Sequence, residues 1–133
     1  MSAASNVIAC ILIGERDAYW QVADLLTPDD FTDRTHAALY RICGELARKE
    51  GGMDVFAVGS EADRQDVCSS ADVVDMAAQV FSYASIRHHA ELLKAESLER
   101  RFRAVCATGA KTGDMATTQA AITALLTAQP AHA

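Results

Sequence analysis

The sequence contains few of the residues that interrupt helices. Only two prolines and seven glycines occur among its 133 residues, and Gly51 and Gly52 form the one adjacent pair. Runs of alternating β-branched and aromatic residues, which are typical of strands, are missing as well. Alanine, leucine, glutamate and arginine, which favour helices, are frequent instead. The composition therefore predicts an all-α protein.

Long apolar runs are also absent. No stretch approaches the roughly 18 consecutive apolar residues that a membrane span requires. The run from Val7 to Ile13 has no basic segment before it and is followed at once by Glu15, Arg16 and Asp17. We therefore expect a helix there, not a signal peptide, and no association with a membrane.

Cysteine is sparse, and the balance of charge is acidic. The four cysteines, Cys10, Cys43, Cys68 and Cys106, lie far apart in the sequence and match neither a metal-binding pair nor a disulfide framework. They are expected to be reduced, buried thiols in a cytoplasmic protein. The net charge of −6, from 18 acidic and 12 basic side chains, repels nucleic-acid phosphates. Direct binding to duplex DNA is not expected.

Catalytic patterns are missing too. A phosphate loop has the form GxxxxGK[ST]. When its lysine is aligned with Lys111, the two glycine positions are occupied by Val105 and Ala110. The four histidines, His36, His88, His89 and His132, show no spacing typical of a zinc site. Asp29 and Asp30 are explained by capping of a helix start. We predict no enzyme activity, no catalytic residue, no cofactor and no metal.

The apolar spacing predicts five helices in the first part of the chain. They cover about residues 6–13, 17–26, 34–50, 55–64 and 69–81, and form a small globular bundle over about 5–84. Ser5 or Asn6, Thr27, Asp54, and Ser69 or Ser70 are the expected N-caps. Phe31 is expected to anchor the turn after Pro28 in the core.

The last part of the chain predicts an antiparallel helical hairpin over about 85–128, followed by a short tail, 129–133. Its first helix covers about 86–107 and carries two apolar stripes, the second of which includes Leu98, Phe102 and Val105. A turn over 107–113 then leads into a helix over 114–128. Bundle, hairpin and tail together make a single domain, 1–133.

The order of these pieces resembles the N-terminal collar domain of the bacterial replicative DNA helicase, the DnaB family. The residues that carry the resemblance are Asp29, Asp30, Phe31, His36, Leu39, Tyr40, Met53 and Asp54. This sequence departs from the family pattern at Thr35, where the family has proline, at Ser69-Ser70-Ala71, where it has two glycines, and at Ser82-Tyr83-Ala84-Ser85, which lacks a proline.

The resemblance implies a non-catalytic replication protein that binds other proteins. In the family the hairpins pair between subunits to form a dimer and then a larger collar, and the collar receives primase. The implied partners are a second copy, a replicative helicase, a primase or a helicase loader. The implied contact residues are Leu98, Phe102, Val105, Ile122 and Leu125. The alternative for each of these residues is packing within its own hairpin.

Other functions stay open at this stage. The protein could be an inhibitor from a phage or mobile element that mimics the collar, or an excised N-terminal fragment of a complete helicase. A helical DNA-binding regulator is a further alternative, because Arg100, Arg101 and Arg103 flank Phe102, a possible stacking group. The interleaved Glu96 and Glu99 favour an ordinary charged helix face instead.

Overall fold

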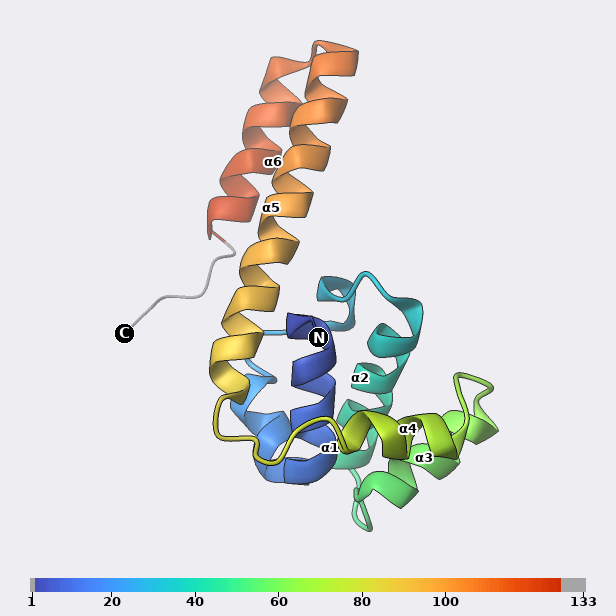
Figure 1. The fold of residues 1–133 in the computed structure, drawn as a ribbon. Helices are drawn as coiled ribbons and strands as arrows, with labels where there is room; N and C mark the ends of the chain where they lie inside the picture. The colour runs from blue at the N-terminus through green and yellow to red at the C-terminus, as the bar shows by residue number, and fades with distance from the viewer. Residues whose placement is uncertain (1, 128–133) are drawn as a thin grey trace. The chain divides into compact units, whose positions relative to one another are not determined.

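The computed structural model describes residues 2–127, in which all regular structure is helical, as the composition predicts (Figure 1). Its elements are α1 (Ala3–Val22), the short 3-10 helix η1 (Pro28–Asp30), α2 (Arg34–Ala47), α3 (Val55–Arg64), α4 (Ser70–Ala77), α5 (Ile86–Thr112) and α6 (Met115–Thr127). The contacts divide the chain into two units, residues 1–93 and 94–133, so that the division lies inside α5. The predicted tail, 129–133, and residue 128 lie outside the described residues.

The first unit has a core built around α1. Every side chain from Val7 to Leu12 is buried, because this stretch is apolar on all sides and is covered by other helices. α1 packs against α2 and α4, and α3 packs against both α2 and α4. The first apolar stripe of α5, formed by Ile86, Ala90 and Leu93, is also buried. This unit therefore has a hydrophobic core of its own.

The start of the chain agrees with the predicted break between two helices, 6–13 and 17–26, but not with their outer ends. One element, α1, covers both as far as Val22 and contains a kink at Glu15, whose φ is +57°. A Cβ atom at Gly14 would lie 2.6 Å from the ring of Tyr83, so a side chain there would displace that ring. The predicted caps, Ser5 or Asn6, were also wrong, since Ser2 is the N-cap and forms a capping box with Ser5.

The C-terminal end of α2 is held by an arginine from α1. Arg16 donates hydrogen bonds to the carbonyl oxygens of Leu46 (3.0 Å), Ala47 (3.4 Å) and Lys49 (2.7 Å). The last carbonyls of a helix lack their full set of intrahelical partners, and the cation also suits the negative end of the helix dipole. The helix ends at Ala47, three residues before the predicted end, and Gly51 follows with a φ of +111°.

The later helices were predicted in the correct order but with some wrong ends. α3 has the predicted range and is capped by Asp54, and Ser69 caps α4. α4 ends at Ala77, four residues earlier than expected, whereas α5 continues to Thr112, five residues beyond the predicted 107. The seven-residue turn over 107–113 was therefore wrong, because most of those residues are helical.

Candidate interaction surface

The second unit consists of the later part of α5, from Lys94, and of α6. Gly113, with a φ of +70°, makes the tight connection between the two helices. Asp114 then caps α6: its carboxylate accepts hydrogen bonds from the backbone N–H of Thr117 (3.0 Å) and from the Thr117 hydroxyl (2.7 Å). The hydrogen bond from the Thr117 N–H is the largest influence on the pKa of Asp114, which lies below its ordinary value. The hairpin therefore starts its return helix with a conventional cap.

The two helices approach each other closely at Gly109. A Cβ atom at this position would lie 2.3 Å from Oγ1 and 2.7 Å from Cγ2 of Thr118. The Thr118 hydroxyl donates a hydrogen bond of 2.7 Å to the carbonyl oxygen of Asp114, which restrains its side chain. Only glycine fits at position 109 without a shift of Thr118.

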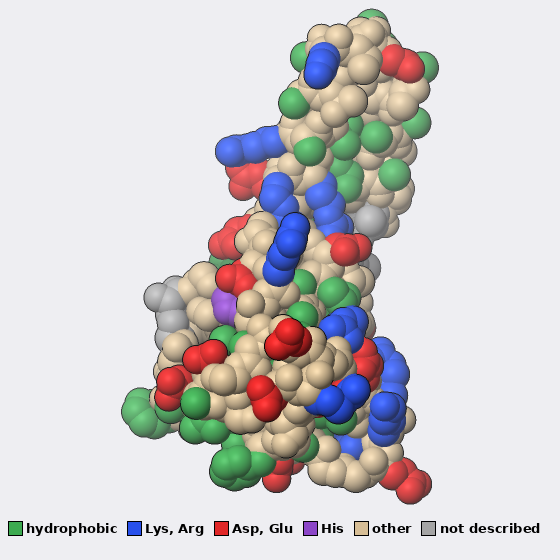
Figure 2. All heavy atoms as spheres, turned by 90° about the vertical axis from the view of Figure 1, so that its right-hand side faces the viewer, with side chains coloured by type: hydrophobic (Ala, Val, Ile, Leu, Met, Phe, Trp, Pro, Cys, Tyr) green, Lys and Arg blue, Asp and Glu red, His purple; other side chains and the backbone are tan. Residues whose placement is uncertain are grey.

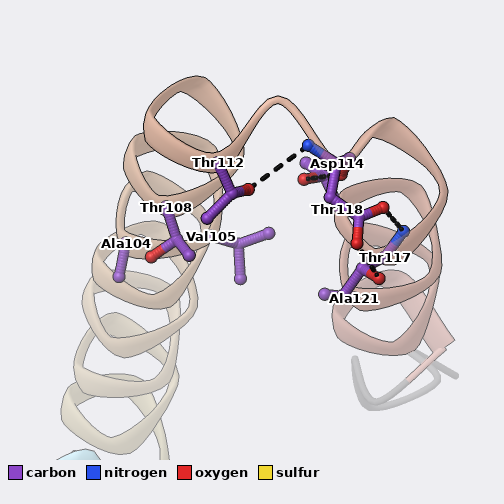
Figure 3. Close-up of a pocket in the computed structure, with 8 residues that line it drawn as sticks. All are labelled: Ala104, Val105, Thr108, Thr112, Asp114, Thr117, Thr118 and Ala121. Carbon is purple, nitrogen blue, oxygen red and sulfur yellow. Dashed lines mark hydrogen bonds between the residues drawn. The ribbon is translucent and has the colours of Figure 1, made fainter.

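A small open groove of about 350 Å³ lies between the same helices (Figure 3). It is lined by Ala104, Val105, Thr108, Thr112, Asp114, Thr117, Thr118 and Ala121. Several polar side chains of this set form hydrogen bonds with nearby backbone groups. For example, Oγ1 of Thr112 accepts a hydrogen bond from the Asp114 N–H (3.3 Å). Asp114 is the one ionisable residue in the lining, so the groove offers no acid–base pair for catalysis.

The five candidate contact residues all lie in this unit. Leu98, Val105, Ile122 and Leu125 are half-buried, whereas Phe102 is 45% exposed. Their partial burial agrees with packing inside the hairpin and leaves part of each surface open.

Two further apolar side chains of α6 are more exposed than any of the five. Met115 is 83% exposed and Leu126 is 62% exposed, and α6 has no fully buried side chain among its described residues. The apolar spacing of this helix includes both residues. It does not show which of them turn away from α5, because that depends on how the two helices are rotated against each other.

The other motif residues lie in the first unit and have structural roles. Asp30 is fully buried and accepts a hydrogen bond from the Thr27 N–H (2.8 Å), whereas Asp29 is exposed. Phe31 is buried with its ring 5.1 Å from that of Tyr40, as expected for an anchor of this turn. The Tyr40 hydroxyl donates a hydrogen bond of 3.1 Å to the carbonyl oxygen of Leu26. This cluster therefore fixes the loop between α1 and α2.

The remaining motif residues serve α2 and α3. The backbone N–H of His36, in the first turn of α2, donates to the carboxylate of Asp33, the N-cap (3.1 Å). Met53 is buried in the core, and the Asp54 carboxylate accepts a hydrogen bond from the Ala57 N–H (2.8 Å). Capping and core packing account for all three.

The part of the chain that the structure describes contains neither a metal site nor a membrane-spanning helix. No group of three or more histidine, cysteine, aspartate or glutamate side chains there could hold a metal ion. No helix among the same residues is long and apolar enough to cross a membrane. His132 lies outside the described residues.

Comparison with known proteins decides the family. The profile described as "DnaB-like helicase N terminal domain" matches residues 1–95, which is more than half of the chain. The chain belongs to this family. The match covers the whole first unit and stops close to the division after Leu93. No curated protein matches the chain.

A solved structure extends the similarity of fold beyond the family match. The crystal structure of the N-terminal domain of DnaB helicase from Mycobacterium tuberculosis superposes with a TM-score of 0.81 and 21% sequence identity. The match covers 90% of this chain and 93% of that one. The prediction of a DnaB N-terminal fold is thereby confirmed, including helices beyond residue 95.

Proposed function

We propose that this protein is a non-catalytic replication accessory protein that binds a second copy of itself through the hairpin, and then a replicative helicase, a primase or a helicase loader. The observation that carries the proposal is the exposed apolar surface of a helix pair with almost no core of its own. The exposed fractions of Phe102, Leu126 and Met115 are 45%, 62% and 83%, and no described side chain of α6 is buried.

A partner would stabilise this surface by covering it. Each large apolar side chain gains on the order of 1.5–3 kcal/mol when it passes from full exposure to full burial. Two short helices have little other means of burying their apolar faces, and isolated helices are marginally stable in water. Exposed apolar patches on otherwise polar surfaces are typical of protein contacts. Membership of a helicase-domain family supports a replication protein as the partner.

The first experiment measures the mass of the protein in solution by light scattering during size exclusion. The wild-type protein is expected to be a dimer or larger, and Phe102→Glu combined with Leu126→Glu is expected to be a monomer. Leu92→Glu is the matched control, because Leu92 has the same exposed fraction as Phe102, 45%, but lies in the first unit. A wild-type protein that stays monomeric at high micromolar concentration would exclude self-association through the hairpin.

The second experiment tests the replication partners. The protein is mixed in turn with the helicase, the primase and the loader of its own organism, and co-elution is expected with at least one of them. A helicase-loading and priming assay then decides between an assembly factor and an inhibitor that mimics the collar. Absence of binding to all three proteins would contradict the proposal.

A DNA-binding regulator is less well supported by the arrangement of charges on α5. Arg103 forms an ion pair with Glu99 at 2.6 Å, so its charge is already partly compensated. Retention of the protein on duplex DNA at physiological salt would revive this alternative. Sequencing of the gene beyond the last codon would show whether the chain is part of a complete helicase.

A further inference from the structure

Most of the net negative charge lies in a short part of the first unit. Between Met53 and Ser85 the chain has six acidic side chains and one basic side chain, Arg64, so this stretch carries −5 of the formal net charge of −6. Arg64 is ion-paired with Glu61 on the same helix. The remaining residues are close to neutral. The surface of α3, α4 and the loop that follows therefore attracts cations.

Four carboxylates of this stretch are exposed and available. They are Asp63, Asp66, Asp72 and Asp75. None of them takes part in a salt bridge within the described residues. Their negative potential also acts on a neighbouring thiol. Burial is the main cause that raises the pKa of Cys68, and the charge of Asp72 is the second.

Large apolar side chains are exposed in the same stretch. Phe56 on α3 is 72% exposed, Phe81 after α4 is fully exposed, and Val74 on α4 is also exposed. Figure 2 faces the side of the first unit where α3 and α4 lie, and it shows hydrophobic side chains gathered near acidic ones at the lower edge of that face. Apolar groups ringed by charge are typical of a contact with another protein.

The two helices that carry Phe56 and Val74 pack closely against each other. A Cβ atom on Gly59 would lie 3.3 Å from the Cα of Ser70, so α3 and α4 nearly touch there. Phe56 lies one turn before Gly59, and Val74 lies one turn after Ser70. Phe81 follows the end of α4 by four residues.

We propose that this surface, which we call the α3–α4 surface, binds a cationic amphipathic helix of another protein. Its residues are Phe56, Asp63, Asp66, Asp72, Val74, Asp75 and Phe81. The apolar face of such a helix covers the two phenylalanines, and its lysines or arginines reach the carboxylates. This is the helix-on-apolar-surface mode of peptide recognition. The site is separate from the hairpin, so it gives the protein a second contact.

A second copy of the chain fits this surface poorly. Outside residues 53–85 the chain carries a formal net charge of only −1, so a second copy offers no net positive charge to these carboxylates. The basic run of α5 is the chain's own candidate ligand, but there Arg103 is already paired with Glu99. A separate protein with a basic helix therefore complements the surface better.

The test uses a fluorescent peptide of roughly 14 residues, about four helical turns, with leucines at helical spacing and lysines elsewhere. Its binding to the full chain is followed by fluorescence anisotropy. Phe56→Ser combined with Phe81→Ser is expected to weaken binding at least tenfold. Asp72→Asn combined with Asp75→Asn is expected to weaken it and to reduce its dependence on salt. All four positions are exposed, so these variants should retain their fold, which circular dichroism checks.

Matched controls separate this site from general attraction and from the hairpin. Asp17→Asn with Glu50→Gln removes the same charge from exposed positions elsewhere in the first unit and should leave binding nearly unchanged. Phe102→Glu with Leu126→Glu should also leave it unchanged. A scrambled peptide of the same composition should bind at least tenfold more weakly, because it lacks an apolar face.

Three results would overturn the proposal. One is equal binding by the scrambled peptide, which would indicate charge alone. Another is loss of peptide binding in the hairpin variant but not in the Phe56 and Phe81 variant. The third is self-association that the Phe56 and Phe81 variant abolishes, which would assign the surface to a second copy. None of these depends on the hairpin experiment, so the two proposals can fail independently.

Discussion

At the scale of single residues, the first unit buries a few polar or titratable groups. They differ in whether a hydrogen bond compensates their burial and in how burial shifts their pKa. Asp30 is fully buried and accepts a backbone hydrogen bond, so its carboxylate is compensated. Cys43 is fully buried among apolar groups, and burial raises the pKa of its thiol to about 12. Burial and the neighbouring Tyr19 raise the pKa of Tyr40 as well. Two measurements follow from these differences.

Replacement of Asp30 by alanine should destabilise the protein. The change removes the fully buried acceptor of the Thr27 N–H, and the loss of such a hydrogen bond costs about 1–3 kcal/mol in the free energy of unfolding. Urea unfolding measures it. Asp29→Ala is the neighbouring control at an exposed position, where we expect a change within about 0.5 kcal/mol. Equal losses in both variants would show that burial of Asp30 is unimportant.

The buried thiol of Cys43 predicts a loss of stability in alkaline solution. Its ordinary pKa is 9.0, and its folded pKa is about 12, so above pH 9 the unfolded chain loses this proton while the folded chain keeps it. Stability should therefore fall with rising pH between these values, with a slope of about 1.4 kcal/mol per pH unit from this group. Below pH 9 the thiol contributes no pH dependence.

The variant Cys43→Ala isolates this slope. Its free energy of unfolding is expected to be lower than that of the wild type at about pH 8, because it leaves a small cavity. The difference should shrink as the pH approaches about 10.5. Cys106→Ala, at a half-buried position, should keep the wild-type slope. A constant difference between wild type and Cys43→Ala across this range would refute the assignment.

At the scale of helices, the sequence predicts existence and order better than ends. Asp54 and Ser69 cap helices where a cap precedes apolar spacing, since capping is a local property. Gly109 does not end a helix as glycine often does, whereas Gly14 directly precedes the kink at Glu15. Each makes room for a side chain distant in sequence, Tyr83 or Thr118, and such contacts cannot be predicted from neighbouring residues. The predicted turn at 107–113 was wrong for this reason.

The candidate site shows the same limit. The apolar spacing predicts a hairpin, and the family resemblance implies Phe102 among its contact residues; this side chain is exposed. It does not rank Met115 and Leu126 above Ile122 and Leu125, although the first two are the more exposed. Exposure depends on the rotation of α6 against α5, and a close approach such as that of Gly109 to Thr118 cannot be predicted from neighbouring residues.

Substitution of Gly109 by alanine should weaken the hairpin. Alanine favours a helix by up to about 1 kcal/mol over glycine. The contact with Thr118 is far below van der Waals distance, however, and overpacking costs about 1–3 kcal/mol. We expect a net loss of stability, measured as a lower thermal midpoint of the helical signal.

Adding Thr118→Ala to Gly109→Ala should recover part of this loss, because it removes the two nearest atoms. Ala110→Gly serves as a control that changes helix propensity without changing this contact. A Gly109→Ala protein that is more stable than the wild type would mean that the two helices are not held this closely.

At the scale of the whole molecule, the two units differ in how they are stabilised. The first has a core of fully buried side chains from α1, α2, α3 and α4. The second has no buried side chain in the described part of α6. Backbone amides without a surrounding core open by local unfolding at low cost. The units should therefore differ in dynamics.

Hydrogen exchange tests this difference. Amides of α6 are expected to exchange at least about tenfold faster than those of α1 and α2 in a dilute sample. The variant Phe102→Glu with Leu126→Glu keeps the comparison free of self-association. Binding of a partner to the hairpin should slow exchange in α6 alone. Equal protection of α6 and α1 in the monomeric variant would show that the hairpin is intrinsically stable.

The exposed outer side of α6 has a consequence for how such a protein diversifies. Substitutions at positions like Met115 remove nothing from the core, so folding places little constraint on them. During evolution, a few point mutations on α6 can therefore change the proposed contact of the hairpin while the first unit keeps its fold. For the same reason, the hairpin is a convenient place to engineer binding to a new partner.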